Sequence, residues 1–99
     1  MTLDQIVNLN EVIMICFGAS WCGPCRKLDP ILQELDNENN NLSVIKIDTD
    51  LNRELPARFG VRSLPSIFFF KKGNEIPVGT MTGAQPKSNF ELKIKQLFV

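Results

Sequence analysis

A continuous apolar run at residues 12–17 is closely followed by the pentapeptide WCGPC at residues 21–25. The run contains β-branched residues and predicts a strand covered on both faces. After the pentapeptide, apolar residues at positions i, i+3, i+4 and i+7 predict a helix with one buried face. These residues are Leu28, Ile31, Leu32 and Leu35. The order of strand, paired cysteines and helix therefore constrains the chain to an α/β fold.

Two cysteines separated by two residues can close a small disulfide ring and open it again. A cysteine at a helix start meets unpaired backbone N–H groups and the positive end of the helix dipole, and both favour the thiolate. Cysteines in such places have pKa values of about 3.5–7.5, against about 8.5 for a free cysteine. Because the thiolate is the reactive form, Cys22 and Cys25 are candidate redox residues for disulfide exchange.

Length, charge and cysteine content narrow the classes of protein that fit this chain. With 99 residues, of which 43% are hydrophobic, the chain is expected to form one domain over residues 1–99. Eleven basic and eleven acidic side chains argue against nucleic acid as a partner. Three cysteines fit a reducing cytosol better than a secreted, disulfide-stapled domain. Since the N-terminus lacks signal-peptide features and the longest apolar runs are too short to span a bilayer, a cytoplasmic protein without membrane contact is expected.

Polar capping residues predict the remaining helices. Thr2 and Gln5 have the spacing of a capping box for a short first helix. Asp50 is expected to cap another short helix that ends at Gly60. Residues 88–91 offer a capping box for a helix at the end of the chain.

Three further strands are predicted after the helix that follows WCGPC. They are residues 42–48, residues 66–71, and a weaker strand at residues 75–82, where Pro77 indicates an edge position. The first two strands of the chain are joined by a helix, which implies a parallel pair with a right-handed crossover. The last two strands are close enough in sequence to form an antiparallel hairpin. The expected order is α-β-α-β-α-β-β-α.

With its motifs in this order, the chain resembles the thioredoxin family over nearly its whole length. WCGPC at residues 21–25 matches the family's active-site sequence in full. Pro30 is placed like the proline that kinks the family's active-site helix. Residues 59–66, FGVRSLPS, resemble the segment that ends in the family's cis-proline, here Pro65. Gly83 resembles a family glycine on the substrate-binding side.

The resemblance implies a thioredoxin fold, in which a central mixed sheet is flanked by helices. The chain starts near the position of the family's first helix, so the N-terminal strand is expected to be missing and the sheet to have about four strands. The strand at residues 42–48 would then be an exposed edge, which can invite association. A monomer is nevertheless expected.

The resemblance also implies the chemistry of the pair. Cys22 would attack a disulfide of a substrate protein, and Cys25 would resolve the mixed disulfide by attacking Cys22. Gly23 and Pro24 would set the geometry and the redox poise of the pair, and a cis Pro65 would lie beside the two cysteines. No cofactor is implied.

The substrate surface implied by the resemblance is flat and apolar, and its expected members are Trp21, Gly60, Val61, Leu64 and Gly83. The function implied is that of a general protein thiol–disulfide oxidoreductase, which reduces disulfide-containing client proteins. It would itself be reduced by thioredoxin reductase. The alternative is a binding platform in which redox activity is incidental, although a pure platform does not need both sulfurs.

The chain departs from the family pattern around the redox pair. Cys16 stands where many thioredoxins have a buried aspartate that helps to deprotonate the resolving cysteine, and Gly18 stands where many have tryptophan. Lys46 matches a family lysine, so Cys16 and Lys46 are candidates for redox tuning. Without the usual carboxylate, Lys46 is expected to reach solvent or another acid, Asp48 or Asp50. The alternative for Cys16 is a small buried hydrophobe.

A CxxC pair is also half of many metal sites. Cys16, Cys22 and Cys25 offer at most three thiolates, and the chain contains no histidine. Because structural zinc sites usually take four protein ligands, no metal is expected.

Overall fold

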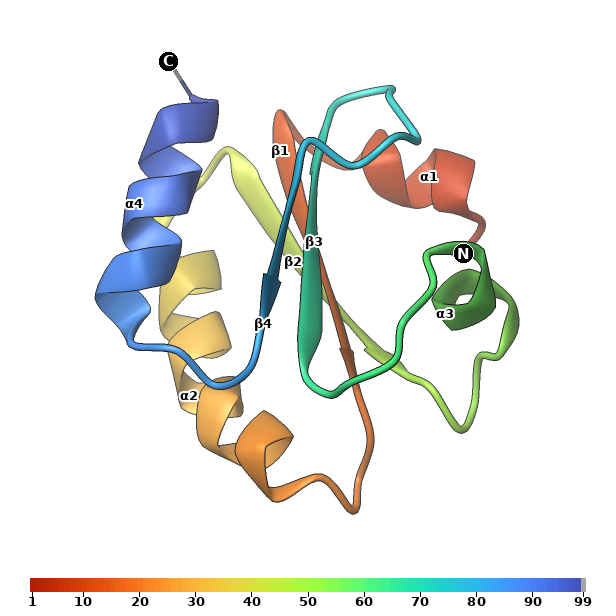
Figure 1. The fold of residues 1–99 in the computed structure, drawn as a ribbon. Helices are drawn as coiled ribbons and strands as arrows, with labels where there is room; N and C mark the ends of the chain where they lie inside the picture. The colour runs from red at the N-terminus through yellow and green to blue at the C-terminus, as the bar shows by residue number, and fades with distance from the viewer. Residues whose placement is uncertain (99) are drawn as a thin grey trace.

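The computed structural model describes residues 1–98. These residues form helices and strands in the predicted alternation, as Figure 1 shows. The elements are α1 (Leu3–Val7), β1 (Val12–Gly18), α2 (Gly23–Glu38), β2 (Leu42–Asp48), α3 (Glu54–Arg58), β3 (Ser66–Lys71), β4 (Gly79–Thr82) and α4 (Lys87–Leu97). Over the described part of the chain, no helix combines the length and apolar character that crossing a bilayer requires.

The strands form one mixed sheet in the order β2-β1-β3-β4. β1 pairs in parallel with β2 and antiparallel with β3, and β4 completes an antiparallel hairpin with β3. The four-stranded mixed sheet expected from the sequence is confirmed, and so is the edge position of β2. Because β1 is central, its C-terminal end brings the residues that follow it to the middle of the sheet edge.

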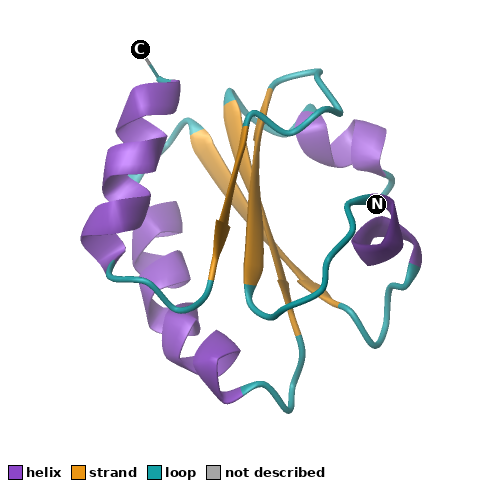
Figure 2. Cartoon of the chain, viewed as in Figure 1, coloured by secondary structure: helices purple, strands orange, loops and turns teal. Residues whose placement is uncertain are grey.

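Helices cover both faces of this sheet (Figure 2). α2 and α4 pack on one face, where β1 contributes Val12, Met14 and Cys16. α1 and α3 pack on the other, where β1 contributes Ile13, Ile15 and Phe17. Successive side chains of a strand point to opposite faces, so a strand covered on both sides must be apolar throughout. The continuous apolar run in the sequence has this cause.

The predicted capping box at the start of α1 is confirmed. The Gln5 N–H donates to Thr2 Oγ1 at 3.2 Å, and the Thr2 N–H donates to Gln5 Oε1 at 2.9 Å. These two bonds satisfy N–H groups that a short helix otherwise leaves without partners. α2 is also present as predicted and continues through Pro30.

The prediction that Asp50 caps α3 is wrong. α3 begins at Glu54, four residues further on, and the Asn52 side chain instead accepts a hydrogen bond from the Leu55 N–H at 3.2 Å. Asp50 lies in the turn after β2, too far from the helix start to reach its first N–H groups. Gly60 follows α3 with a φ of 66°, a left-handed conformation that favours glycine.

The expected capping box at residues 88–91 is also wrong. α4 begins one residue earlier, at Lys87, and is preceded by Pro86. Pro86 has a φ of −59°, which its ring fixes and which suits entry into a helix. The helix itself is present, and the serine that indicated a cap lies inside its first turn.

The fourth strand is shorter than the expected range of residues 75–82. β4 starts at Gly79, and Pro77 lies in the loop before it. Proline cannot donate a ladder hydrogen bond, so pairing with β3 begins only after it. The Val78 N–H donates to the Phe69 carbonyl at 2.8 Å, immediately before β4. The edge position that Pro77 indicated is confirmed.

Lys87 ties the start of α4 to the end of α2. Its ammonium lies 2.6 Å from a Glu38 carboxylate oxygen and 3.3 Å from one of Glu34. The hydrogen bond to Glu38 is the largest cause of a raised pKa of Lys87, and Glu34 adds to it. The two helices that pack on the same sheet face are thereby also joined at the surface.

Candidate active site

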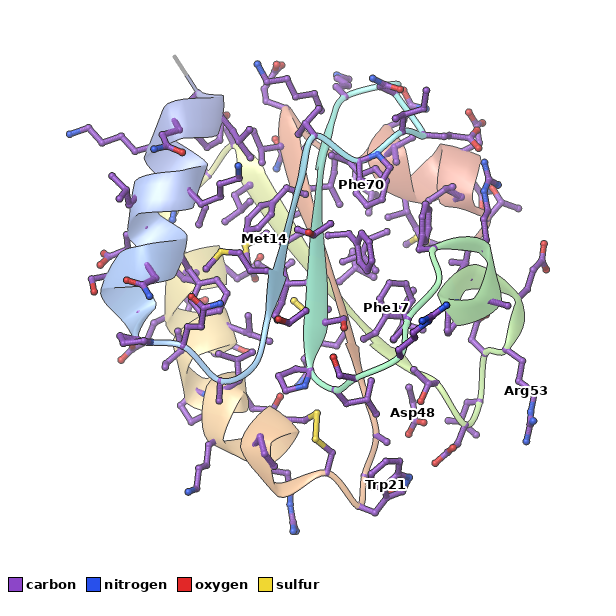
Figure 3. The ribbon with its side chains drawn as sticks, viewed as in Figure 1. Met14, Phe17, Trp21, Asp48, Arg53 and Phe70 are labelled. Atoms are coloured by element: carbon purple, nitrogen blue, oxygen red, sulfur yellow. A yellow bond between two sulfur atoms is a disulfide. The ribbon has the colours of Figure 1, made fainter. Side chains whose placement is uncertain are left out.

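The two cysteines of WCGPC are joined by a disulfide at the start of α2. Cys22 is the N-cap of this helix, and the Cys25 N–H donates to Cys22 Sγ at 3.2 Å. Gly23 and Pro24 form the first residues of the helix between them. When the disulfide opens, the backbone N–H and the helix dipole favour negative charge on Cys22 Sγ. Figure 3 shows the disulfide as a yellow bond where α2 begins.

A segment before β3 packs against the disulfide from the side. The Leu64–Pro65 peptide bond is cis, as the resemblance implied. Leu64 contacts the small buried cluster formed by Ala19, Cys22 and Cys25. The carbonyl of Pro65 accepts a hydrogen bond from the Gly83 N–H at 2.9 Å, which joins this segment to the residues after β4.

Trp21 extends into solvent from the loop between β1 and α2 (Figure 3). Its side chain is 67% exposed, and its indole Nε1–H donates to Asp50 Oδ2 at 2.8 Å. The sequence analysis missed this partner and assigned Asp50 to a helix cap. One signal was available, because β1 and β2 are parallel and the loops after both strands must meet at the same sheet edge. The bond holds a large apolar ring in a fixed place beside Cys22.

A groove of about 560 Å³ runs past Cys22 and is called here the outer groove. It is lined by residues of three loops and the start of two helices: Trp21, Cys22, Gly23, Pro24, Thr49, Pro56, Val61, Arg62 and Leu64. Three of the expected substrate-surface residues thus come together: Trp21, Val61 and Leu64. The lining that the sequence analysis missed includes Thr49 and Arg62, which carry no motif.

The other two expected members of the substrate surface lie outside the lining of the outer groove. Gly60 and Gly83 have φ values of 66° and 83°, and a Cβ built at either would meet no atom within 4 Å among the described residues. Both positions therefore owe their glycine to backbone conformation rather than to a close neighbour. Gly83 reaches the site through its bond to Pro65.

A second hollow, of about 260 Å³, is lined by Cys25 but not by Cys22 and is called here the inner cavity. Its walls include Cys16, Gly18 and Cys25, together with Leu32 of α2 and Pro65. A Cβ at Gly18 would lie 3.3 Å from Cys25 Sγ. A side chain at position 18 would therefore crowd that sulfur.

Cys16 lies at the buried end of the inner cavity and keeps a free thiol. Burial raises its pKa to about 12, and the nearby positive charge of Lys46 offsets this only in part. The thiol is therefore neutral at physiological pH, as the interpretation of Cys16 as a small buried hydrophobe requires.

Lys46 reaches solvent as expected, but its acidic partner is neither Asp48 nor Asp50. Its ammonium lies 3.1 Å from Asp29 Oδ1, and both side chains are about half exposed. β2 pairs with β1 and packs against α2, so Lys46 on β2 faces Asp29 on that helix. The ion pair stands at the mouth of the inner cavity, where both residues contribute to the lining.

Within residues 1–98, no three His, Cys, Asp or Glu side chains gather in a way that could hold a metal ion. Cys16 belongs to the core under α2 and α4, whereas Cys22 and Cys25 form a cluster with Ala19.

Comparisons with known proteins agree with this geometry. The family model of thioredoxin matches residues 2–96. The chain is 40% identical to a thioredoxin of Pyropia yezoensis over 86 residues, which cover 86% of this chain and 78% of that protein. It is 39% identical to a thioredoxin of Haemophilus influenzae over 92 residues, covering 92% and 84%.

Solved structures give the same result. A mutant thioredoxin from Halobacterium salinarum superposes with a TM-score of 0.86 at 34% identity, over 96% of this chain and 81% of that one. Oxidized mitochondrial thioredoxin 3 from Saccharomyces cerevisiae superposes with a TM-score of 0.84 at 27% identity, over 94% and 85%.

The chain belongs to the thioredoxin family and has the thioredoxin fold. The Cys22–Cys25 disulfide is consistent with a redox-active dithiol pair. The activity that follows is that of a protein disulfide oxidoreductase.

Proposed function

We propose that this protein reduces the disulfides of many client proteins and is itself reduced by a thioredoxin reductase. The observation that carries the proposal is the position of Cys22, which is the N-cap of α2 and also lines the outer groove. A cysteine sulfur that is favoured as a thiolate and that borders a groove is suited to attack a disulfide of an extended polypeptide bound in that groove.

The proposed cycle has two exchanges. The Cys22 thiolate attacks one sulfur of a client disulfide, the client S–S bond breaks, and the other client sulfur leaves as a thiolate. Cys25 then loses its proton and attacks Cys22 Sγ, which releases the second client thiolate and closes the Cys22–Cys25 disulfide. Two electrons pass from the dithiol to the client.

Other residues are proposed to support these steps. Trp21, Val61 and Leu64 line the outer groove and would contact the client, with the backbone of Leu64 available for pairing. Gly60 and Gly83 would shape the neighbouring loops. Redox tuning is assigned to the two residues between the cysteines, to the cis-proline and to two residues of the inner cavity: Gly23, Pro24, Pro65, Cys16 and Lys46.

Cytoplasmic location, a monomeric state and a role in electron transport belong to the same proposal. The cytoplasmic location is supported by the single CxxC pair, since the described residues contain no second disulfide. The role in electron transport is supported by the proposed cycle, which passes electrons from a reductase to client proteins.

The test uses purified protein, NADPH, a thioredoxin reductase and insulin. Oxidation of NADPH that depends on all components is expected. Cys25→Ser should trap mixed disulfides with client proteins, whereas Cys22→Ser, the matched control, should trap none through the outer groove. If both variants retain client binding and the function in cells, the alternative of a binding platform replaces this proposal.

A further inference from the structure

Among the described residues that line the outer groove, Arg62 is the only one with a charged side chain, apart from the thiolate that Cys22 can form. The rest of the lining is apolar, small or uncharged. Arg62 is exposed, so its guanidinium is accessible to a molecule that approaches the groove. A client segment bound beside Cys22 therefore meets one positive charge on an otherwise uncharged surface.

The guanidinium of Arg62 takes part in no ion pair within residues 1–98. Arg58, four residues earlier, differs in this respect, because its Nη2 lies 3.0 Å from Glu75 Oε1. Arg62 can bind a carboxylate without first giving up such a partner. Its planar fork of N–H donors matches a carboxylate, which can accept two parallel hydrogen bonds from it. The group that best complements this part of the groove is thus a carboxylate.

The backbone on either side of Arg62 is held in place next to the redox pair. The Val61 N–H donates to the Pro56 carbonyl at 2.9 Å. On the other side, Leu64 packs against the cluster that contains Cys22. The positive charge is therefore carried by a segment with a fixed position relative to the nucleophilic sulfur.

Two acidic residues, Asp48 and Asp50, flank Thr49 of the groove lining, and both are engaged locally. Asp50 accepts the Trp21 Nε1–H at 2.8 Å, and Asp48 Oδ1 accepts the Asp50 N–H at 2.8 Å. Neither carboxylate belongs to the lining of the outer groove. They do not pair with Arg62, so its charge remains available to a client.

We propose that Arg62 is a specificity-determining residue, which favours client disulfides with an aspartate or glutamate close in sequence to the attacked cysteine. This inference rests on the proposed function and names a class of substrate for it. The client carboxylate pairs with the guanidinium while Cys22 attacks the neighbouring sulfur, and a lysine in the same place is repelled. Because the pair forms at an exposed site, the expected preference is about two- to fivefold.

The first experiment compares matched peptides. Each carries one cysteine in a disulfide with 2-thiopyridine and, next to it, glutamate, glutamine or lysine, before the cysteine in one series and after it in another. Reduced Cys25→Ser protein attacks the peptide sulfur through Cys22, and the released 2-thiopyridone is measured by its absorbance. Each second-order rate constant is divided by that of the same peptide with 2-mercaptoethanol, which corrects for the intrinsic reactivity of the disulfide.

In at least one series, the glutamate peptide should react about two- to fivefold faster than the lysine peptide after this correction. Equal corrected rates in both series, or faster reaction of the lysine peptide in both, overturn the proposal.

The second experiment changes the charge of the groove. In the same Cys25→Ser background, Arg62→Gln should abolish the preference, and Arg62→Glu should reverse it in favour of lysine. The matched control is Arg53→Gln, which removes the same charge from an exposed arginine outside the groove lining that points away from the molecule (Figure 3). This control should retain the preference. A preference that survives both Arg62 substitutions, or that Arg53→Gln abolishes equally, overturns the proposal.

Should the Arg62 variants fail to fold, the protein that retains Arg62 decides through salt. Raising the salt concentration from about 0.01 M to about 1 M shortens the Debye length from about 30 Å to about 3 Å. The preference for the glutamate peptide should shrink over this range. A preference that salt leaves intact does not arise from an exposed ion pair and overturns the proposal.

Failure of this inference is distinguishable from failure of the proposed function. If all peptides react at equal corrected rates and the unaltered protein reduces insulin, Arg62 does not select clients and the proposed function stands. If the unaltered protein does not reduce insulin, the proposed function itself fails.

Discussion

The two faces of the sheet are packed in different ways, although β1 contributes to both. On the side of α1 and α3, the rings of Phe17, Phe59, Phe68 and Phe70 contact one another with centroid separations of 5.4 to 6.3 Å. On the side of α2, Cys16 and Gly18 leave the inner cavity open behind the disulfide. Phe17 of β1 thus packs against other aromatic rings, whereas its neighbours Cys16 and Gly18 line the inner cavity.

Within β1, the face that carries the aromatic rings contributes mainly to stability, and the face that borders the disulfide contributes to the chemistry of the site. Edge-to-face rings, such as the Phe17–Phe68 pair at 81°, hold the strand from one side. On the face under α2, Val12 and Met14 pack in the core, and only the end of the strand near the sulfurs carries the small residues Cys16 and Gly18. The comparison predicts that substitutions on the two faces affect different measurements.

The largest effect is expected for Phe17→Ala, on the ring face. Removing a fully buried ring leaves a cavity among the other phenylalanines and should lower the free energy of unfolding by about 3–5 kcal/mol. Cys16→Ala, the adjacent control on the other face, should cost only about 1 kcal/mol, since it removes one sulfur beside an existing cavity. Urea unfolding of the oxidised proteins measures both, and equal losses would contradict the comparison.

A pH-dependent loss of stability is expected from the α2 face alone. Burial raises the pKa of Cys16 from 9.0 to about 12, so the unfolded chain ionises this thiol while the folded chain keeps it protonated. The stabilising contribution is present below pH 9.0 and is lost as the pH rises toward 12.

The loss should approach about 1.4 kcal/mol per pH unit within that range. It is measured as the difference in unfolding free energy between the unaltered protein and Cys16→Ala, since lysines titrate in both. A difference that stays constant with pH would show that Cys16 is not held in a buried environment.

A smaller change in stability, with a change in rate, is expected for Cys16→Asp. A carboxylate at this buried position should cost about 1–3 kcal/mol, because its desolvation is only partly relieved by the cavity and by Lys46. It should also speed insulin reduction, since a base near Cys25 assists its deprotonation. Cys16→Asn provides the uncharged control and should not raise the rate. If the free energy of unfolding and the rate of insulin reduction both remain unchanged, Cys16 does not tune the redox pair.

The smallest effect is expected for Asp29→Asn, at the mouth of the cavity. The Asp29–Lys46 pair is about half exposed, and such pairs contribute about 0–1 kcal/mol. A double-mutant cycle with Lys46→Met isolates the pair, and the coupling should shrink as salt is added. A coupling that salt leaves intact would mean that the pair is more shielded from solvent than its exposure indicates.

Much of the fold was predictable because its signals are local. The apolar run of β1, the helical spacing in α2 and the turn after β3 each fix an element without knowledge of the rest. The errors arose where local and distant partners compete. Aspartate is a common helix-capping residue. The Asp50 side chain instead accepts a hydrogen bond from Trp21, which is distant in sequence. Pro86 determines the start of α4 through its ring, although the serine after it carries the usual capping signal.

The site was predictable to the extent that the motif carries it. WCGPC and the resemblance identified the disulfide and the cis-proline, and both are confirmed. The partner of Lys46 and the inner cavity were not predictable, since both depend on how α2 lies against β2 and on side chains that are absent rather than present. The kink at Pro30, the single domain over residues 1–99 and the individual roles of the site residues stay predictions.

Trp21 is the only tryptophan of the chain, which contains no tyrosine. It directly precedes Cys22 in the sequence, and its indole N–H donates a hydrogen bond to Asp50. Phenylalanine emits only weakly, so nearly all near-ultraviolet emission from this protein originates beside the reactive sulfur. The molecule carries a built-in optical reporter of its own redox cycle, so turnover can be followed in real time without attaching a dye.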